Sequence, residues 1–430
     1  MKHDAWPWRR GLAWLACLGP LFYLSYGFAN HLAAARSGVP SVVFDWERGI
    51  PFLAWTILPY WTINAFYAAS LFVHRRAADV DRQGRRLLTA QFVAVSCFLL
   101  FPLKFAFARP ETSGWSGAMF DALTSFDKPY NQAPSLHIAL LVILWSLYTP
   151  KLPRGLRPVL HAWFALIGIS VLTTYQHHFI DIPTGVLLGA FCLWCWPETG
   201  PSPLMSWRRG RSAAHWRLAM YYGFGALACV VLALLGGAWL WSLWPATSLS
   251  LVALAYAGLD AQVFQKTAQG RIPLGPRLLL APYLLAARIN QWWWTRGSAA
   301  TVALGEGLGF GRVPRWGERL ADGESLVDLS AELQGDAAAI QAIPCLDLIP
   351  PSPAQLREAC AAIENARSAG KVRVACALGF SRSASAVLAW WLRTGREPNL
   401  EQAERRLRAL QPRLVLTPAH REAIAAAAHG

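Results

Sequence analysis

The feature that most constrains this chain is a series of long apolar runs between Gly11 and about Phe264. From about Gly297 onward, apolar and charged residues alternate as they do in soluble domains. Over all 430 residues, 54% are hydrophobic and 15% are charged, which lies outside the range of ordinary soluble proteins. The sequence therefore predicts a polytopic α-helical membrane domain followed by a soluble domain.

Several of these runs approach the length of roughly 20 residues that a helix needs to cross a bilayer. We expect about eight transmembrane helices. They are predicted near 11–34, 52–73, 87–108, 134–149, 158–176, 179–196, 218–243 and 247–264. Met1–Arg10 carries basic residues ahead of the first run, as a signal peptide would, but no convincing cleavage site follows. We therefore interpret the first run as an uncleaved span.

The formal net charge of +15 could indicate nucleic-acid binding, but the basic residues concentrate in every second loop between apolar runs. These basic loops lie near 75–86, 151–157 and 208–217. Far fewer basic residues occur in the loops near 35–51, 109–133 and 176–179. Because basic loops stay in the cytoplasm, we predict a multi-pass protein of the inner (cytoplasmic) membrane with a cytoplasmic C-terminal domain, and no nucleic-acid partner.

The segment after the last apolar run is predicted to lie on the cytoplasmic membrane surface. Leu278–Trp294 mixes apolar residues with Arg288 and ends in three consecutive tryptophans. Such a pattern is typical of an interfacial helix with an aromatic anchor. The predicted domains are a transmembrane domain over 1–270, an interfacial amphipathic linker over 271–296 and a soluble domain over 297–430.

Ionisable residues gather at one edge of the predicted membrane domain. Counted by loops, that edge faces the periplasm or exterior, and its residues are Lys104, Arg109, Ser135, His137, His177, His178 and Asp181. Ionisable groups are costly at a membrane edge, although any one of them could be a snorkelling or interfacial residue. Together they suit a phosphate, since cations neutralise it and an imidazole held by a carboxylate can attack phosphorus.

Over roughly 100–190, these residues resemble the three motifs of the type-2 phosphatidic acid phosphatase superfamily, whose core has six helices. Lys104 with Arg109 resembles the first motif, Pro134-Ser135-Leu136-His137 the second, and Ser170 with His177 and Asp181 the third. The resemblance implies a phosphohistidine at His177, oriented by Asp181. It implies that His137 protonates the leaving oxygen, and that the phosphate oxygens are held by Lys104, Arg109 and Ser135.

One position departs from that superfamily. The arginine that usually follows the serine of the third motif is Val171 here. With Leu136 in the second motif and His178 beside the nucleophile, the pattern is more similar to the inositol-phosphorylceramide and sphingomyelin synthase branch. That resemblance implies transfer of a phospho-headgroup between lipids, so the site is predicted to be either a hydrolase or a transferase.

A second phosphate site is predicted in the tail. Val372-Arg373-Val374-Ala375 is a strand candidate that leads into Cys376, and Arg382-Ser383 opens a helical pattern that continues to about Arg393. Backbone N–H groups and the helix dipole of such a loop hold an anion and lower the pKa of the cysteine. Arg382 can bind two phosphate oxygens, and Gly379 allows the tight turn. Asp347, at the end of another strand candidate, is the candidate acid, although taken alone it could equally cap a helix after Pro350.

Roughly 296–425 resembles the dual-specificity phosphatases, and within them the phosphatidylglycerophosphate phosphatase branch. The resemblance implies an α/β fold. We predict that the site uses no metal and no cofactor. It implies that Cys376 is the thiolate nucleophile, Arg382 the phosphate binder, Asp347 the general acid and Ser383 the hydroxyl that aids thiolate departure. This family normally has His before the cysteine, whereas this chain has Ala375, which should raise the cysteine pKa.

These sites lead to three functional hypotheses. The first is a bifunctional membrane enzyme that dephosphorylates phospholipid phosphomonoesters at a cysteine site and a phosphohistidine site. The second makes the transmembrane half a phospho-headgroup transferase with a fused phosphatase. The third, based on Ala375 and Val171, is a non-enzymatic phosphate-binding sensor or scaffold. The expected partners are a lipid-phosphate substrate and the membrane.

Overall fold

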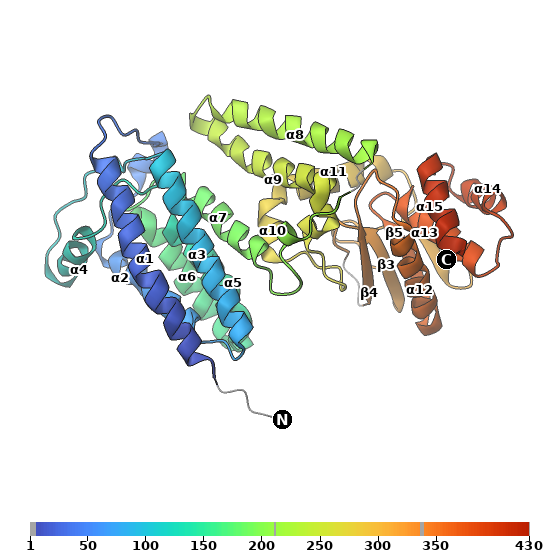
Figure 1. The fold of residues 1–430 in the computed structure, drawn as a ribbon, viewed down its shortest axis with the longest axis horizontal. Helices are drawn as coiled ribbons and strands as arrows, with labels where there is room; N and C mark the ends of the chain where they lie inside the picture. Colours follow the sequence, from blue (N-terminus) through green and yellow to red (C-terminus); the bar gives the residue numbers. More distant parts are fainter. Residues whose placement is uncertain (1–5, 210–211, 336–338, 430) are drawn as a thin grey trace. The chain divides into compact units, whose positions relative to one another are not determined.

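The computed structural model describes residues 6–209, 212–335 and 339–429. The chain forms two compact units, Met1–Ser202 and Pro203–Gly430. Figure 1 shows the helices of the first unit in blue to green and the elements of the second in green to red.

The first unit is helical over most of its described residues. Its longer helices are α1 (Trp8–Ala34), α2 (Ile57–Ser70), α3 (Ala77–Leu100), α4 (Gly114–Thr124), α5 (Leu136–Tyr148), α6 (Arg157–Thr173) and α7 (Asp181–Cys195). Helix α3 ends earlier than the run near 87–108 predicts, because Pro102 removes a backbone donor just beyond it. The predicted outer loop 109–133 contains α4.

Two glycines let helices α5 and α7 approach closely. A Cβ added at Gly185 would lie 2.6 Å from the carbonyl oxygen of Ser135, and one at Gly189 would lie 2.7 Å from that of Ala139. Small residues permit such backbone approach between apolar helices. The N-termini of both helices meet as a result, with the amide of Ser135 donating to the carbonyl of Asp181 at 3.2 Å.

Four helical segments in the described part of the chain are long and apolar enough to cross a membrane. They are Trp8–Ala34, Arg154–Thr173, Ala213–Ala233 and Gly237–Phe264. Helices α5 and α7 lie within shorter apolar stretches. The predicted number of about eight transmembrane helices is therefore not confirmed, although membrane association is compatible with these helices.

The second unit begins with apolar helices and continues into a five-stranded sheet. Its helices are α8 (Ala213–Ala233), α9 (Leu243–Leu254), α10 (Leu274–Leu279), α11 (Ala281–Thr295), α12 (Pro353–Ala369), α13 (Arg382–Arg393), α14 (Leu400–Leu410) and α15 (Pro418–His429). Its strands are β1 (Thr301–Gly305), β2 (Leu308–Arg312), β3 (Glu324–Ser330), β4 (Ile340–Cys345) and β5 (Lys371–Cys376).

The sheet has the order β1-β2-β5-β3-β4, in which β1 and β2 are antiparallel and the other pairs are parallel. The predicted strand at Val372–Ala375 is confirmed as β5, and the predicted helix that ends near Arg393 is confirmed as α13. Cys376 is therefore the last residue of the central strand, where loops that follow parallel strands converge.

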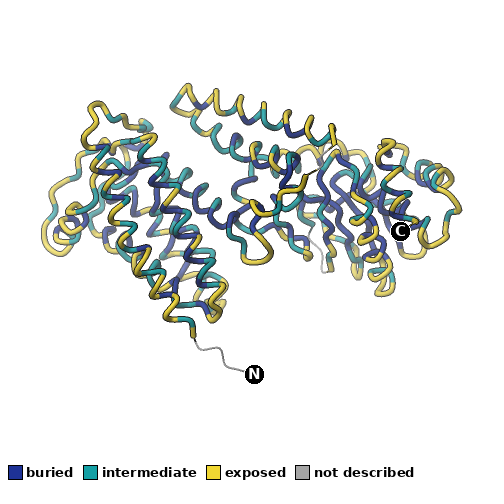
Figure 2. Tube along the Cα trace, viewed as in Figure 1, coloured by how far each residue is buried: buried dark blue, intermediate teal, exposed yellow. Residues whose placement is uncertain are grey.

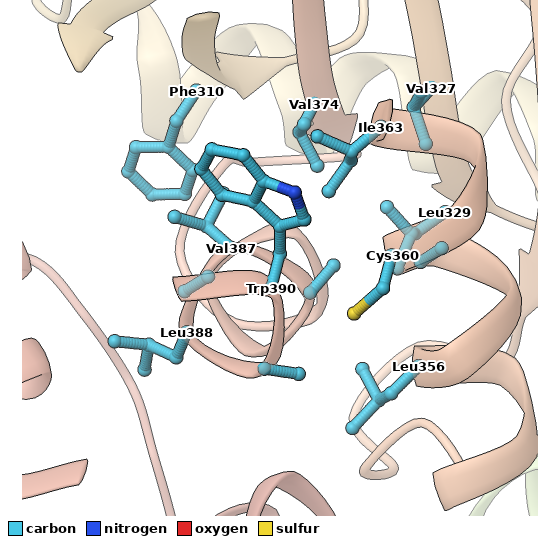
Figure 3. Close-up of a cluster of buried hydrophobic side chains, with 14 of the residues drawn as sticks. Phe310, Val327, Leu329, Leu356, Cys360, Ile363, Val374, Val387, Leu388 and Trp390 are labelled. Atoms are coloured by element: carbon cyan, nitrogen blue, oxygen red, sulfur yellow. The ribbon is translucent and has the colours of Figure 1, made fainter. Parts of the chain in front are cut away.

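One face of the sheet is covered by α12 and α13. Strand residues alternate between the two faces, so Val374 and Phe310 point toward this side. Figure 3 shows Val387 and Trp390 of α13 packed against them, beside Ile363 of α12. This cluster is the hydrophobic core that fixes the start of α13 relative to the end of β5.

The other face is covered by residues that precede the predicted phosphatase domain. The buried cluster of Val313, Leu326 and Ala375 packs against Ala287 of α11. On the same helix, Gln291 is buried and its amide donates to the carbonyl oxygens of Val313 and Ala377, at 2.8 and 3.0 Å. The predicted interfacial segment is thus helical, and one side of it forms a layer of the α/β unit.

The opposite side of α11 is exposed. Trp292, Trp293 and Trp294 are each about half exposed, as are Leu285 and Ile289. Contact of these exposed apolar side chains with a membrane surface stays a prediction. The division between compact units falls at 202/203, whereas the predicted domain boundary falls near 270. The predicted division into membrane and soluble parts also stays a prediction.

Two candidate active sites

The loop between β5 and α13 brings the predicted nucleophile and its helpers together. The sulfur of Cys376 lies 3.3 Å from Ser383 Oγ and 3.3 Å from the amide nitrogen of Gly379, which donates to it. Cys376 is 2% exposed. Donors directed at sulfur stabilise a thiolate, which is the reactive form of cysteine.

Gly379 is required by the shape of this loop. Its φ of +78° lies in the left-handed region, and a Cβ at this position would come within 2.7 Å of the backbone of Gly311. The amide of Val313 also donates to the carbonyl of Cys376 at 2.9 Å. The end of β2 and the residue that follows it therefore contact this loop directly.

Arg382, the first residue of α13, is held by acceptors on two loops. Its guanidinium makes a bidentate ion pair with Glu332, with distances of 3.0 and 2.7 Å, and donates to the carbonyl of Cys345 at 2.8 Å. Its Nη2 lies 3.0 Å from Asp347 Oδ1. Arg382 is 2% exposed, so its fork is fixed in orientation close to the cysteine loop.

The two carboxylates on Arg382 have different pKa shifts. Burial raises the pKa of Asp347, and the nearby charge of Glu332 raises it further, although Arg382 opposes both effects. Burial also favours the neutral form of Glu332, but its close pairing with Arg382 holds its pKa below the ordinary value. When two carboxyl groups are shifted apart in this way, one can stay ionised while the other carries a proton. Asp347 is the better acid of the pair.

Sequence reasoning missed Glu332, although a usable signal exists. Glu332 follows β3, which pairs in parallel with β5. Acidic residues just beyond the carboxyl ends of adjacent parallel strands are placed together at one edge of the sheet. An acidic residue two positions beyond the end of the strand could therefore have been predicted to reach Arg382.

Sequence reasoning also missed His420. Its Nε2 lies 2.8 Å from the hydroxyl of Ser381 in the cysteine loop, and its Nδ1 lies 2.7 Å from the hydroxyl of Thr417. Burial lowers the pKa of His420, and Arg421 lowers it further. The neutral imidazole therefore connects α15 to the loop.

In the first unit, the predicted histidine–carboxylate pair forms. The Nδ1 of His177 lies 3.1 Å from Asp181 Oδ2, which also accepts a 3.0 Å hydrogen bond from the amide of His178. Asp181 is fully buried and His177 is 6% exposed. Since Nδ1 is engaged, Nε2 is the nitrogen of His177 left to face a substrate.

His178 has a different environment. Its Nδ1 lies 2.9 Å from Glu47 Oε2, and its Nε2 accepts a 3.0 Å hydrogen bond from the amide of Ala106. His178 therefore has both ring nitrogens engaged within the protein. It ties together loops far apart in sequence, as does Glu47, which also accepts from the amides of Phe44 and Phe179.

A cavity of about 200 Å³ opens beside His177. Its lining includes Tyr26, Arg109, Asp127, Lys128, Asn131, Gln132, Tyr175 and His177. These residues come from loops that follow α3, α4 and α6 and from α1 itself. The cavity thus joins one imidazole, two basic side chains and one carboxylate, which is a chemistry suited to a phosphate.

The other predicted residues of the histidine site lie differently. Among the described residues that line the cavity, Lys104, Ser135 and His137 do not occur. Lys104 is exposed, the hydroxyl of Ser135 accepts from the amide of Ile138 at the start of α5, and His137 stacks on Tyr60 with ring centroids 4.1 Å apart. Their predicted roles stay predictions, and Lys128 is the second cation that the cavity contains.

Asp127 is the residue of this site that the sequence did not indicate. Its Oδ1 accepts a 3.0 Å hydrogen bond from the hydroxyl of Tyr26. Burial raises the pKa of Asp127 to about 6, although the bond from Tyr26 and the neighbouring His177 lower it. A carboxyl group with this pKa can exchange a proton near neutral pH. No local pattern marks it, because α1 and the loop before α5 meet only in the folded chain.

No protein-family model matches the chain, and no curated protein sequence matches it. Several solved structures resemble part of it. Tk-PTP in the active form is 23% identical with a TM-score of 0.27, covering 30% of this chain and 97% of its own. A human DUSP28 variant is 23% identical with a TM-score of 0.27, and the match covers 30% of this chain and 95% of that structure. PTPMT1 in complex with PI(5)P is 14% identical with a TM-score of 0.25, and the match covers 29% of this chain and 92% of that structure.

These solved structures are phosphatase-like, and each resembles less than a third of this chain. The resemblance of roughly 100–190 to the type-2 phosphatidic acid phosphatases stays a prediction. The chemistry of both sites follows from their own geometry.

Proposed function

We propose that this protein is a membrane-associated cysteine phosphatase that hydrolyses a phospholipid phosphomonoester. The observation that carries the proposal is the arrangement around Cys376. Its sulfur accepts a hydrogen bond from the amide of Gly379 and lies beside the hydroxyl of Ser383. Both contacts are at the N-terminus of the helix that begins with Arg382. An anion is stabilised at such a helix N-terminus, and a thiolate there is activated for attack.

The reaction takes place in two steps. The Cys376 thiolate attacks phosphorus, the new S–P bond forms as the P–O bond to the alcohol breaks, and protonated Asp347 donates its proton to the departing oxygen. Water then attacks phosphorus, Asp347 takes up a proton, and the S–P bond breaks. Ser383 donates a hydrogen bond to the thiolate that leaves. Arg382 holds phosphoryl oxygens throughout, while Glu332 keeps its fork in place.

A lipid substrate is supported by what surrounds this site within the second unit. The large apolar side chains exposed on α8 are Trp216, Met220, Tyr221, Phe224, Leu227, Val230, Val231 and Leu232. Figure 2 shows this helix exposed along much of its length. Continuous exposed apolar surface of this kind is typical of lipid contact. In the same compact unit, Tyr256 follows α9 and contacts Asp347.

The experiment is a phosphate-release assay with the purified full chain and mixed vesicles that contain a phospholipid phosphomonoester. In a His177→Ala background, which removes the second candidate site, Cys376→Ser is expected to lower the rate by at least about a thousandfold, because serine is a far weaker nucleophile at neutral pH. A matched control is Cys360→Ser, a second buried cysteine, which lies on α12 and not in the loop. Undiminished release by Cys376→Ser would disprove the cysteine mechanism.

The cavity beside His177 supports a second activity, phosphoryl transfer through a phosphohistidine. His177 is oriented by Asp181, and Arg109 and Lys128 supply positive charge in the same cavity. The acceptor is water in a bifunctional phosphatase or a lipid hydroxyl in a headgroup transferase. We propose that this site faces the periplasm or exterior of the inner membrane while the cysteine site is cytoplasmic, as the loop charges indicate.

Lipid analysis distinguishes these two acceptors. Cells that carry His177→Ala should lose a phosphodiester lipid if the site is a transferase. An unchanged lipid profile with reduced release of free phosphate would instead support hydrolysis. If His177→Ala changes neither the lipids nor the free phosphate, the second activity is disproved.

A further inference from the structure

The cysteine site is held in part by the end of the last apolar segment, Gly237–Phe264. Ala255–Leu259 (η7) is a π-helical turn that continues α9, and it is followed by the 3-10 turn Asp260–Phe264 (η8). Such π turns are frequent at functional positions. Tyr256 in this turn is 1% exposed, and its hydroxyl donates a 2.9 Å hydrogen bond to the backbone carbonyl of Asp347.

The loop that carries Asp347 needs such an anchor. The next residue, Leu348, has a φ of +59°, a left-handed conformation that is unfavourable for a branched side chain. Leu348 is also 66% exposed, so its own packing does little to hold the loop. The bond from Tyr256 fixes the main chain at the residue whose carboxyl group must reach the leaving oxygen.

The same segment also anchors the second carboxylate that contacts Arg382. The ammonium group of Lys266, just beyond η8, is buried and donates to the carbonyls of Ser330 and Leu333 at 2.6 and 2.5 Å. These two residues flank Glu332. Lys266 also pairs with Asp328 at 2.5 Å. Both carboxylate-bearing loops of the site are therefore attached to residues near the end of an apolar helix.

We propose that Tyr256 is a positioning residue for general-acid catalysis, acting through Asp347. The inference rests on the proposed phosphatase function. The hydroxyl of Tyr256 keeps the carboxyl group of Asp347 directed at the departing oxygen while that oxygen gains its proton. The end of the apolar segment Gly237–Phe264 thus helps to position the acid, and the residues from 297 onward do not hold it alone.

The leaving group provides the test. An alcohol is a poor leaving group and needs protonation as the P–O bond breaks, whereas para-nitrophenolate leaves with little help from an acid. A defect in positioning the acid must therefore slow hydrolysis of an alkyl phosphate and spare an aryl phosphate. A general loss of structure would slow both.

The experiment compares full-length protein in detergent micelles with octyl phosphate and para-nitrophenyl phosphate as the probes. The variants are Tyr256→Phe, Asp347→Asn and the double variant. Asp347→Asn keeps the carbonyl that Tyr256 contacts. Tyr256→Phe should lower kcat for octyl phosphate by about tenfold, the value of one hydrogen bond, and change kcat for the aryl phosphate by less than about twofold.

Non-additivity is the decisive readout. If Tyr256 acts through the acid, the double variant should be no slower on octyl phosphate than Asp347→Asn alone, within about twofold. The matched control is Tyr222→Phe, which removes a hydroxyl from the ring stacked 5.5 Å from that of Tyr256. This control should leave both rates unchanged.

Three results would overturn the inference: an equal loss on both probes, no loss on octyl phosphate, or losses that multiply in the double variant. Cys376→Ser in the same assay separates this failure from that of the proposed function. If aryl phosphate turnover persists when Cys376→Ser is combined with His177→Ala, the phosphatase mechanism itself is wrong and the role of Tyr256 falls with it. If only the Tyr256 results fail, the cysteine mechanism stands.

Discussion

The two candidate sites differ in how their cations are held. In the cysteine site, Arg382 is 2% exposed and its guanidinium contacts both Glu332 and Asp347. In the histidine site, Arg109 is partly exposed and its guanidinium lies 4.6 Å from the centre of the Phe120 ring. One cation is fixed by charged partners, and the other rests against an aromatic ring at the wall of a cavity.

This difference follows from how each site is assembled. Residues 376–383 supply the nucleophile, the cation and the hydroxyl of the cysteine site from a single loop. The histidine site takes its groups from separate loops that only helix packing brings together. A site made from one loop is preorganised by local backbone geometry, whereas the other depends on the whole unit.

The largest effect that would sharpen this comparison concerns the two adjacent histidines. His177→Ala should abolish His177-dependent lipid transfer or phosphate release, a loss of at least about a thousandfold, because it removes the proposed nucleophile. His178→Ala removes a partner of buried Glu47 and should chiefly destabilise the fold, by about 1–3 kcal/mol. Activity per folded molecule and the thermal unfolding temperature, measured for both variants, separate the two roles. Equal activity losses in equally stable variants would contradict them.

Arg382→Lys tests whether the fixed fork matters. Lysine keeps the charge but loses the planar pair of donors that Glu332 orients. We expect kcat/KM for a phosphomonoester to fall about 100- to 1000-fold. Arg393→Lys, at the far end of the same helix, serves as the control. A rate within a few-fold of the wild type would mean that point charge alone suffices at this position.

The carboxyl group of Asp127 predicts a pH dependence that is specific to the histidine site. With a pKa of about 6, Asp127 is ionised above that pH and can accept the proton of an attacking hydroxyl. Activity at this site should therefore fall as the pH drops through 6. Asp127→Asn should lower the rate at neutral pH by about 100-fold and remove this limb of the profile. A profile that keeps the limb would assign it to another group.

The raised pKa of Asp347 predicts the opposite pH dependence at the cysteine site, a fall in activity as the pH rises. The general acid must be protonated, and its pKa lies above the ordinary value of 3.8. Hydrolysis of octyl phosphate should therefore decline as the pH rises through that raised pKa, and Asp347→Asn should flatten the decline. The rate of para-nitrophenyl phosphate hydrolysis serves as the control, since it depends little on the acid. An unchanged decline in Asp347→Asn would exclude Asp347 as its source.

The smallest effect concerns stability alone. The hydrogen bond from Arg312 lowers the pKa of Glu318 to about 2 from 4.5, so this carboxylate stabilises the fold above pH 4.5 and progressively less as the pH falls toward 2. Glu318→Gln should lower the thermal unfolding temperature at neutral pH, and the difference from the wild type should shrink in acid. Cysteine-site activity should stay within about twofold. A difference that is independent of pH would contradict the assignment.

The sequence was most informative where function depends on local spacing. The strand before Cys376 and the helix that begins at Arg382 were both predicted and are present. The spacing of His177 and Asp181 likewise indicated a pair that the structure contains. In each case the partners are close in sequence, so the short segment between them allows few relative positions.

Groups supplied by distant segments were not predictable in the same way. Asp127 reaches its site through helix packing, which no local pattern encodes. Glu332 reaches Arg382 through the sheet order, and its only signal in the sequence is its place just beyond a strand. The amphipathic pattern of 278–294 correctly indicated a helix, but periodicity does not say which surface a helix covers. In the structure, one side of α11 covers the sheet that carries Ala375.

The measurement that tests the central claim most directly is mass spectrometry of a trapped phosphoenzyme. Ser383→Ala removes the hydroxyl beside the thiolate that departs, so the second step should slow and the covalent intermediate should accumulate. The variant is mixed with octyl phosphate and the reaction is quenched rapidly. We expect one phosphoryl group on the peptide that contains Cys376. In a His177→Ala background, which cannot form the proposed phosphohistidine, a phosphoryl group found on another residue, or turnover with no covalent adduct, would contradict this mechanism.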